Sequence, residues 1–163
     1  MLGIRGLDPF GLVHAVFGLA SVVLGLGVVL LHKGTLLHRR VGLLYAASML
    51  MLNVTALAIY DLFGGFGPFH VLALVSLATT AAGVLHAWLQ RPRAAWMEFH
   101  ARWMSWSYAG VVSAFVAEIA TRIPGVDFVA GVLVPTGLIT AGAAVLIHTS
   151  VPRTLAHVME QRP

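Results

Sequence analysis

Five apolar stretches, each about as long as a membrane is thick, occupy nearly all of this 163-residue chain. A helix that rises 1.5 Å per residue needs roughly 20 apolar residues to cross the hydrocarbon core of a bilayer. Charged residues, glycine or proline bound each stretch. The sequence therefore predicts five membrane-spanning helices, at about residues 10–31, 41–62, 70–90, 103–123 and 128–150.

The composition excludes a soluble globular domain. Hydrophobic residues make up 59% of the chain and charged residues only 10%, whereas an ordinary soluble domain carries about 25% charged residues. The loops are too short to hold a separate domain, so we expect one integral-membrane domain over residues 1–163. Its predicted fold is an all-α bundle with an up-and-down core of four helices and a fifth helix beside it. The chain has no cysteine, which excludes disulfides and thiolate metal sites.

The cationic residues predict how the chain is oriented. Eight of the ten are expected on one side of the membrane and only Arg5 and Arg122 on the other. The eight are Lys33, Arg39, Arg40, Arg91, Arg93, Arg102, Arg153 and Arg162. The positive-inside rule then puts the N-terminus outside and the C-terminus in the cytoplasm, in the cytoplasmic (inner) membrane of the cell. These charges flank the spans, which favours binding to anionic lipid headgroups at the cytoplasmic face over binding to nucleic acid.

Four of the eight histidines lie at span ends in an alternating pattern. His14 and His70 open the first and third spans, while His38 and His100 precede the second and fourth. Because alternate helices of an up-and-down bundle often stand diagonally, the pattern predicts one histidine pair at each membrane face. Diagonal imidazoles are the arrangement that holds the iron of haem b between helices. The alternative is that each imidazole merely reaches into the headgroup layer.

The distance between the two histidine pairs argues against electron transfer between two haems. The outer and inner pairs would lie roughly 25–30 Å apart at 1.5 Å per residue, which is long for direct transfer between two haems.

A carboxylate suggests a different kind of site. The ionisable Glu118 lies inside a predicted span, where such residues often mark functional sites. Two imidazoles and a carboxylate, His14, His70 and Glu118, form a plausible ligand set for zinc or iron. The simpler alternative is an ion pair between Glu118 and Arg122, four residues apart on one helix.

Several segments resemble a known family. They are His14-x3-Gly18, the stretch from Gly34 to Tyr45 that contains His38-Arg39-Arg40, Phe66-Gly67-Pro68-Phe69-His70, and the stretch from Phe99 to Tyr108 that begins with Phe99-His100. Over about residues 10–124 the chain resembles a bacterial family of multi-pass membrane proteins known as domain of unknown function 2306. The resemblance implies a helical membrane fold and no particular activity.

Three classes of function remain open from the sequence. The first is a small b-type haem protein that exchanges electrons with quinone, with His14, His70, His38 and His100 as ligands. The second is a metal-dependent membrane enzyme that uses the zinc or iron site described above. The third is an accessory subunit that packs into a larger membrane complex through helix faces with small residues. No catalytic residue can be assigned, since no Ser-His-Asp arrangement or phosphate-binding loop is recognisable.

Overall fold

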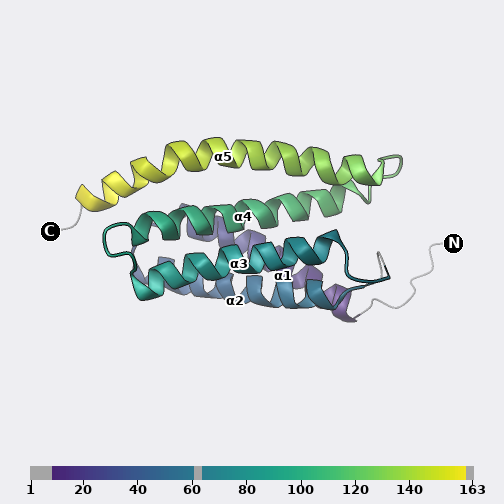
Figure 1. Cartoon of the computed structure of the whole chain (residues 1–163), viewed down its shortest axis with the longest axis horizontal. Coiled ribbons are helices and arrows are strands. Elements are labelled where there is room, and N and C mark those ends of the chain that lie inside the picture. Colours follow the sequence, from purple (N-terminus) through teal and green to yellow (C-terminus); the bar gives the residue numbers. More distant parts are fainter. Residues whose placement is uncertain (1–8, 61–63, 161–163) are drawn as a thin grey trace. The chain divides into compact units, whose positions relative to one another are not determined.

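The computed structural model describes residues 9–60 and 64–160, and these residues form five α-helices joined by short turns (Figure 1). The helices are α1 (Pro9–Leu30), α2 (Leu36–Ala58), α3 (Pro68–Leu89), α4 (Trp96–Ala120) and α5 (Phe128–Glu160). The described residues contain no strand. The predicted all-α class and the predicted number of helices are therefore confirmed.

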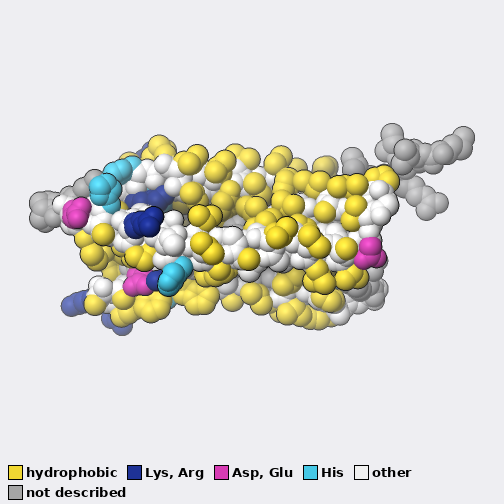
Figure 2. All heavy atoms as spheres, turned by 90° about the horizontal axis from the view of Figure 1, so that it is seen from above, with side chains coloured by type: hydrophobic (Ala, Val, Ile, Leu, Met, Phe, Trp, Pro, Cys, Tyr) yellow, Lys and Arg dark blue, Asp and Glu magenta, His cyan; other side chains and the backbone are white. Residues whose placement is uncertain are grey.

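Four of these helices are long and apolar enough to cross a membrane, namely α1, α2, α3 and α5. Hydrophobic side chains cover most of the face seen in Figure 2, as expected for a surface that meets lipid tails instead of water. α4 is 25 residues long but carries Glu98, Arg102 and Glu118, so its composition is more polar. The chain is thus a multi-pass helical protein, and the fourth span and the orientation stay predictions.

α2 begins five residues before the predicted span at 41 because a polar residue starts the helix. Thr35 is the N-cap, and its hydroxyl accepts a hydrogen bond of 3.2 Å from the backbone N–H of His38. Such a cap satisfies one of the free N–H groups at a helix start. α2 ends at Ala58, whereas positions 61 and 62 of the predicted span lie outside the described residues.

α4 and α5 also extend beyond their predicted spans. α4 begins at Trp96 instead of 103, and its polar first turns carry an ion pair in which Arg102 Nε donates to Glu98 Oε1 at 2.8 Å. Pairs at this four-residue spacing stabilise helices that are exposed to water. α5 continues to Glu160 instead of 150 and passes through Pro152. Hydropathy therefore located the apolar middle of these helices and missed their polar ends.

The chain divides into two compact units whose boundary lies within α3. The N-terminal unit, Met1–Leu77, holds α1, α2 and the start of α3, and the C-terminal unit, Ala78–Pro163, holds the remainder. α1 packs along α2 in the first, and α4 packs along α5 in the second. The prediction of one integral-membrane domain over residues 1–163 stays a prediction.

The side chain of a lysine caps the C-terminal end of α1. Lys33 Nζ donates to the carbonyl oxygens of Val28, Val29 and Leu31 at 2.9, 2.6 and 3.1 Å. These carbonyls have no partner within the helix, and a cation there also interacts favourably with the helix dipole. Burial lowers the pKa of the Lys33 ammonium from its usual 10.5. Gly34 then turns the chain with a φ of 81°, a conformation that strains residues with a side chain.

Each of two helix pairs carries a buried hydrogen bond between hydroxyl groups. Ser21 Oγ of α1 lies 2.9 Å from Ser48 Oγ of α2, and Thr80 Oγ1 of α3 lies 2.7 Å from Ser107 Oγ of α4. All four side chains are buried. Without water in the hydrocarbon core, such hydroxyl pairs fix the register between neighbouring helices.

We expect Ser48→Ala and Ser107→Ala each to lower the free energy of unfolding by about 0.6 kcal/mol and at most about 1.7 kcal/mol, the average and the maximum measured for hydrogen bonds between membrane helices. Unfolding can be followed by steric trapping in bilayers. Ser150→Ala is the matched control because Ser150 is exposed on α5. A loss no larger than that of the control would show that these hydroxyl pairs do not contribute to stability.

Candidate functional site

The histidines of the predicted haem sites fall in different units. His14, His38 and His70 belong to the N-terminal unit, whereas His100 and Glu118 belong to the C-terminal unit. Each histidine is best judged by its hydrogen bonds, because a bond at one ring nitrogen determines which nitrogen carries the proton.

His14 lies on α1 and faces α2. Its Nδ1 is 3.2 Å from Thr55 Oγ1, and the Thr55 hydroxyl has a carbonyl within reach for its own proton, that of Met51 at 2.8 Å. When the hydroxyl proton goes to that carbonyl, the hydroxyl oxygen accepts a hydrogen bond from His14 Nδ1–H. In the neutral ring this leaves the lone pair on Nε2, the form in which an imidazole can bind a metal.

At His70 the hydrogen bond makes Nδ1 the acceptor instead of the donor. It lies in the first turn of α3, where the backbone N–H of Gly67 donates to His70 Nδ1 at 3.0 Å. A residue at this position often bonds back to the N-cap residue, and Pro68 suits the first helical position because its missing N–H would have no partner there. Since a backbone N–H can only donate, Nδ1 must accept. The proton of the neutral ring therefore lies on Nε2.

The Nε2–H of His70 is buried without an acceptor. The residue is only 3% exposed, and its Nε2 has no hydrogen-bond partner among the described residues. Two aromatic rings lie against the imidazole, with centroid distances of 4.6 Å to Tyr60 and 4.9 Å to Phe66. A buried donor without a partner costs about 1–3 kcal/mol. Such a group in a native structure calls for an explanation, and a ligand is one.

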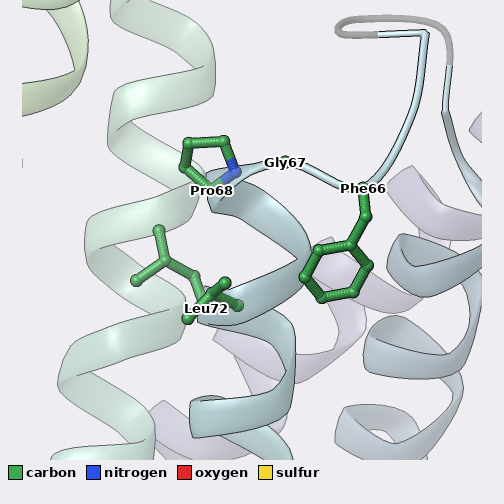
Figure 3. Close-up of a pocket in the computed structure, with 5 residues that line it drawn as sticks. Phe66, Gly67, Pro68 and Leu72 are labelled. Atoms are coloured by element: carbon green, nitrogen blue, oxygen red, sulfur yellow. The ribbon is translucent and has the colours of Figure 1, made fainter.

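An open apolar depression adjoins this histidine. Its lining consists of Phe66, Gly67, Pro68, Val71 and Leu72, none of which is charged. Figure 3 shows Pro68 and Leu72 along one face of the first turn of α3, with Phe66 set apart from them across Gly67. We call His70, Tyr60 and the lining of this depression the His70 site. It combines one buried hydrogen-bond donor with aromatic and aliphatic surroundings.

A second pair of histidines lies at the turn between α3 and α4. His100 Nδ1 is 2.8 Å from the carbonyl oxygen of Gly83, and His86 Nδ1 is 2.7 Å from that of Arg91. Carbonyl oxygens only accept, so both rings donate from Nδ1 and keep the lone pair on Nε2. His86 also stacks on Phe99 with a centroid distance of 5.0 Å. Backbone carbonyls thus orient both rings.

Glu118 forms the ion pair with Arg122 that the spacing indicated as the simpler alternative. The described residues contain no group of three or more His, Cys, Asp or Glu side chains placed to hold a metal ion. The zinc or iron site at His14, His70 and Glu118 stays a prediction without support from this geometry.

The hydrogen bond at His70 also bears on the predicted outer haem. An axial ligand donates its lone pair to the iron, usually from Nε2 with Nδ1–H bonded to an acceptor. His70 lacks that arrangement, because its Nδ1 accepts from Gly67 N–H and its Nε2 carries the proton. The pair would hold haem b only if His70 gave up its bond to Gly67. This haem site stays a prediction, and the geometry does not favour it.

The partners of these histidines were not predicted from the sequence. Thr55, Tyr60 and Phe66 lie 41, 10 and 4 positions away from the histidines that they contact. One local signal was available, since a glycine three residues before His70 and a proline directly after that glycine are typical of a helix start. That signal predicts the accepting role of Nδ1 and hence the position of the proton.

The long apolar helices and short turns define the chain as a multi-pass helical membrane protein. A family model described as "Predicted membrane protein (DUF2306)" matches residues 11–156. The chain belongs to this family, as its histidine segments indicated. No curated protein and no solved structure matches it.

Proposed function

We propose that the protein binds a membrane-soluble small molecule that carries a hydrogen-bond acceptor, at the His70 site. The observation that carries this proposal is the buried Nε2–H of His70, whose direction is set by the bond between Gly67 N–H and Nδ1. An acceptor atom at hydrogen-bond distance would satisfy this donor and remove its energetic cost.

The surroundings of the donor indicate a largely apolar ligand. The depression beside His70 offers only hydrocarbon and backbone surface, and Tyr60 and Phe66 are 47% and 63% exposed. Phe66 belongs both to this lining and to the ring stack on His70, so a ligand in the depression would lie against a ring that contacts the imidazole. Ligand sites are typically apolar with a few placed polar groups that fix orientation. The His70 site has that composition.

Purification with native lipids tests the proposal. We expect a small apolar molecule to remain with the wild-type protein in native nanodiscs and to be lost from His70→Asn, as measured by mass spectrometry of organic extracts. Asparagine at position 70 can still accept from Gly67 N–H but has no donor at the place of Nε2. His148→Asn is the matched control, because His148 is exposed on α5. Equal content in all three proteins would contradict the proposal.

We further propose that the protein lies in the cytoplasmic membrane with its N-terminus outside, where its cationic rim meets anionic lipid headgroups. The support is the division of lysine and arginine between the two sides, eight against two. Arg5 and Arg162 of that count lie outside the described residues.

Reporter fusions test the orientation. Alkaline phosphatase inserted in the turn at Gly64–Gly67 should be active, because this turn is expected outside, and a fluorescent protein fused after Pro163 should fluoresce in the cytoplasm. The reverse pair of results would overturn the proposed orientation.

Electron transfer through haem b is a second proposal. Its support is the placement of His14, His70, His38 and His100 at the ends of alternate helices, the pattern that predicts one histidine pair at each membrane face. A reduced-minus-oxidised visible spectrum of the purified protein tests it. A Soret band and a sharp alpha band are expected if haem is bound, and their absence from protein expressed with excess haem would remove the proposal.

A further inference from the structure

We propose that the turn between α3 and α4 binds anionic phospholipids, with the guanidinium groups of Arg91 and Arg93 at the headgroup phosphates and aromatic rings of α4 at the edge of the hydrocarbon core. This inference rests on the proposed placement of the protein in a membrane. It names the part of the cationic rim that selects the lipid, and all of this part lies within the C-terminal unit.

The two arginines of the turn have no counter-charge from the protein. Arg91 and Arg93 are exposed, and no carboxylate of the described residues lies within ion-pair distance of either guanidinium. Arg102 on α4 differs, because Glu98 pairs with it at 2.8 Å. A guanidinium group can donate two parallel hydrogen bonds to a phosphate. The turn therefore offers two positive charges to a ligand that carries a phosphate.

Aromatic side chains form a stripe on the helix that follows this turn. The stripe has four members, spaced by three, four and three residues on one face of α4: Trp96, Phe99, Trp103 and Trp106. Phe99 and Trp103 are 41% and 38% exposed, and Trp88 at the end of α3 is 79% exposed. Tryptophan is enriched where hydrocarbon meets headgroups, because its ring is apolar and its N–H is polar. The stripe therefore indicates the level of that boundary.

A histidine joins the turn to the stripe. His86 Nδ1 donates to the carbonyl oxygen of Arg91 at 2.7 Å, and the His86 ring stacks on Phe99 with a centroid distance of 5.0 Å. Pro92 lies between the two arginines, and its carbonyl oxygen accepts a hydrogen bond of 2.9 Å from the backbone N–H of Trp96. The arginines and the aromatic stripe thus belong to one surface.

The position of the turn favours a lipid over an acidic protein or a nucleic acid. α3 is long and apolar enough to cross a membrane, and it ends at Leu89, two residues before Arg91. The arginines therefore directly follow an expected span, at the level of the headgroup phosphates. A cation at the surface of an anionic membrane contributes about fivefold to binding. An acidic partner in water would bind the arginines and leave the aromatic stripe uncovered.

Intrinsic tryptophan fluorescence tests the inference, because all four tryptophans of the chain lie within residues 88–106. The full-length protein is placed in mixed vesicles of phosphatidylglycerol and phosphatidylcholine, in which one of the two lipids is brominated and quenches nearby indole rings. We expect brominated phosphatidylglycerol to quench more strongly than brominated phosphatidylcholine. Bromine near the headgroup should also quench more strongly than bromine at the chain end.

Variants that remove or keep the two charges separate their effect from that of the surrounding structure. Arg91→Gln and Arg93→Gln together should lower the relative affinity for phosphatidylglycerol by at least about fivefold. Arg91→Lys with Arg93→Lys should retain most of the preference, because the charges remain. Arg122→Gln is the matched control, since Arg122 lies beyond the other end of α4 and pairs with Glu118. Circular dichroism and size-exclusion profiles check that each variant is folded.

Native mass spectrometry counts the phosphatidylglycerol retained by the whole protein and so distinguishes this inference from the proposed rim. If the double glutamine variant is quenched like wild type while the whole protein retains phosphatidylglycerol, the lipid binds elsewhere on the rim and only this inference is overturned. A wild type without preference in both measurements overturns both. Tryptophans that no brominated lipid quenches would lie outside the bilayer, which overturns the inference and favours an acidic partner in water.

Discussion

Tyr45→Ala is expected to lower the free energy of unfolding by about 3 kcal/mol, the largest effect of any single truncation in the N-terminal unit. Tyr45 is 1% exposed and is among the largest fully buried side chains of the described chain. Helices in a membrane are held together mainly by close packing, so removal of a buried ring loses its dispersion contacts and leaves a void. Steric trapping in bilayers would measure the change.

Leu43→Ala is the matched control for this truncation. Leu43 lies two residues away on the same helix and is 65% exposed, so its side chain is expected to face lipid. Lipid tails can fill the space that an exposed side chain leaves, and the expected loss is below about 0.5 kcal/mol. Similar losses for Tyr45→Ala and Leu43→Ala would contradict the burial of Tyr45.

Gly83→Val is expected to destabilise the C-terminal unit by about 3 kcal/mol, because Gly83 allows α3 and α4 to approach closely. A Cβ atom at position 83 would lie 2.5 Å from Met104 Sδ, 2.8 Å from its Cγ and 3.2 Å from its backbone nitrogen. The side chain of Met104 can move, but its backbone nitrogen cannot move without shifting α4. The same approach brings the Gly83 carbonyl to His100, so this hydrogen bond should also be lost.

Gly110→Val on α4 provides the control for Gly83→Val, because no atom lies within 4 Å of a Cβ built at Gly110. Both variants add the same side chain to a helix, so their difference isolates the helix contact. Adding Met104→Ala to Gly83→Val should recover part of the lost stability, since it removes the two closest atoms. Equal stability of the two glycine variants would refute the close approach at Gly83.

The helices were predictable where hydropathy and helix length coincide. α1 and α3 begin and end within two residues of their predicted spans, because neither helix contains Asp, Glu, Lys or Arg and both are apolar nearly to their ends. The starts of α2 and α4 and the end of α5 were missed, since polar residues continue these helices outside the apolar part. Thr35 as N-cap and the Glu98–Arg102 pair are the local causes for α2 and α4. Hydropathy locates the part of a helix that crosses the hydrocarbon core, but it does not locate the residues at which the helix begins and ends.

The candidate site was predictable only in part. The sequence singled out His14, His38, His70 and His100 by their positions at span ends, but position does not reveal which ring nitrogen carries the proton. That property depends on hydrogen-bond partners, among them Thr55 for His14, Gly67 for His70 and Gly83 for His100. Only the Gly67 partner is close enough in sequence to be predicted from a local pattern. The aromatic contacts of His70 come from Tyr60 and Phe66, which lie outside the helices.

The protonation of His70 is the most direct test of the account, because the proposed ligand depends on a proton at Nε2. Solid-state NMR of protein labelled with ¹⁵N-histidine in bilayers can measure it, and His70→Asn identifies the His70 signals by their loss. We expect the proton on Nε2 and an Nδ1 that accepts a hydrogen bond from Gly67 N–H. A proton on Nδ1 with a free lone pair on Nε2 would contradict the account and would favour a metal or haem ligand at this position instead.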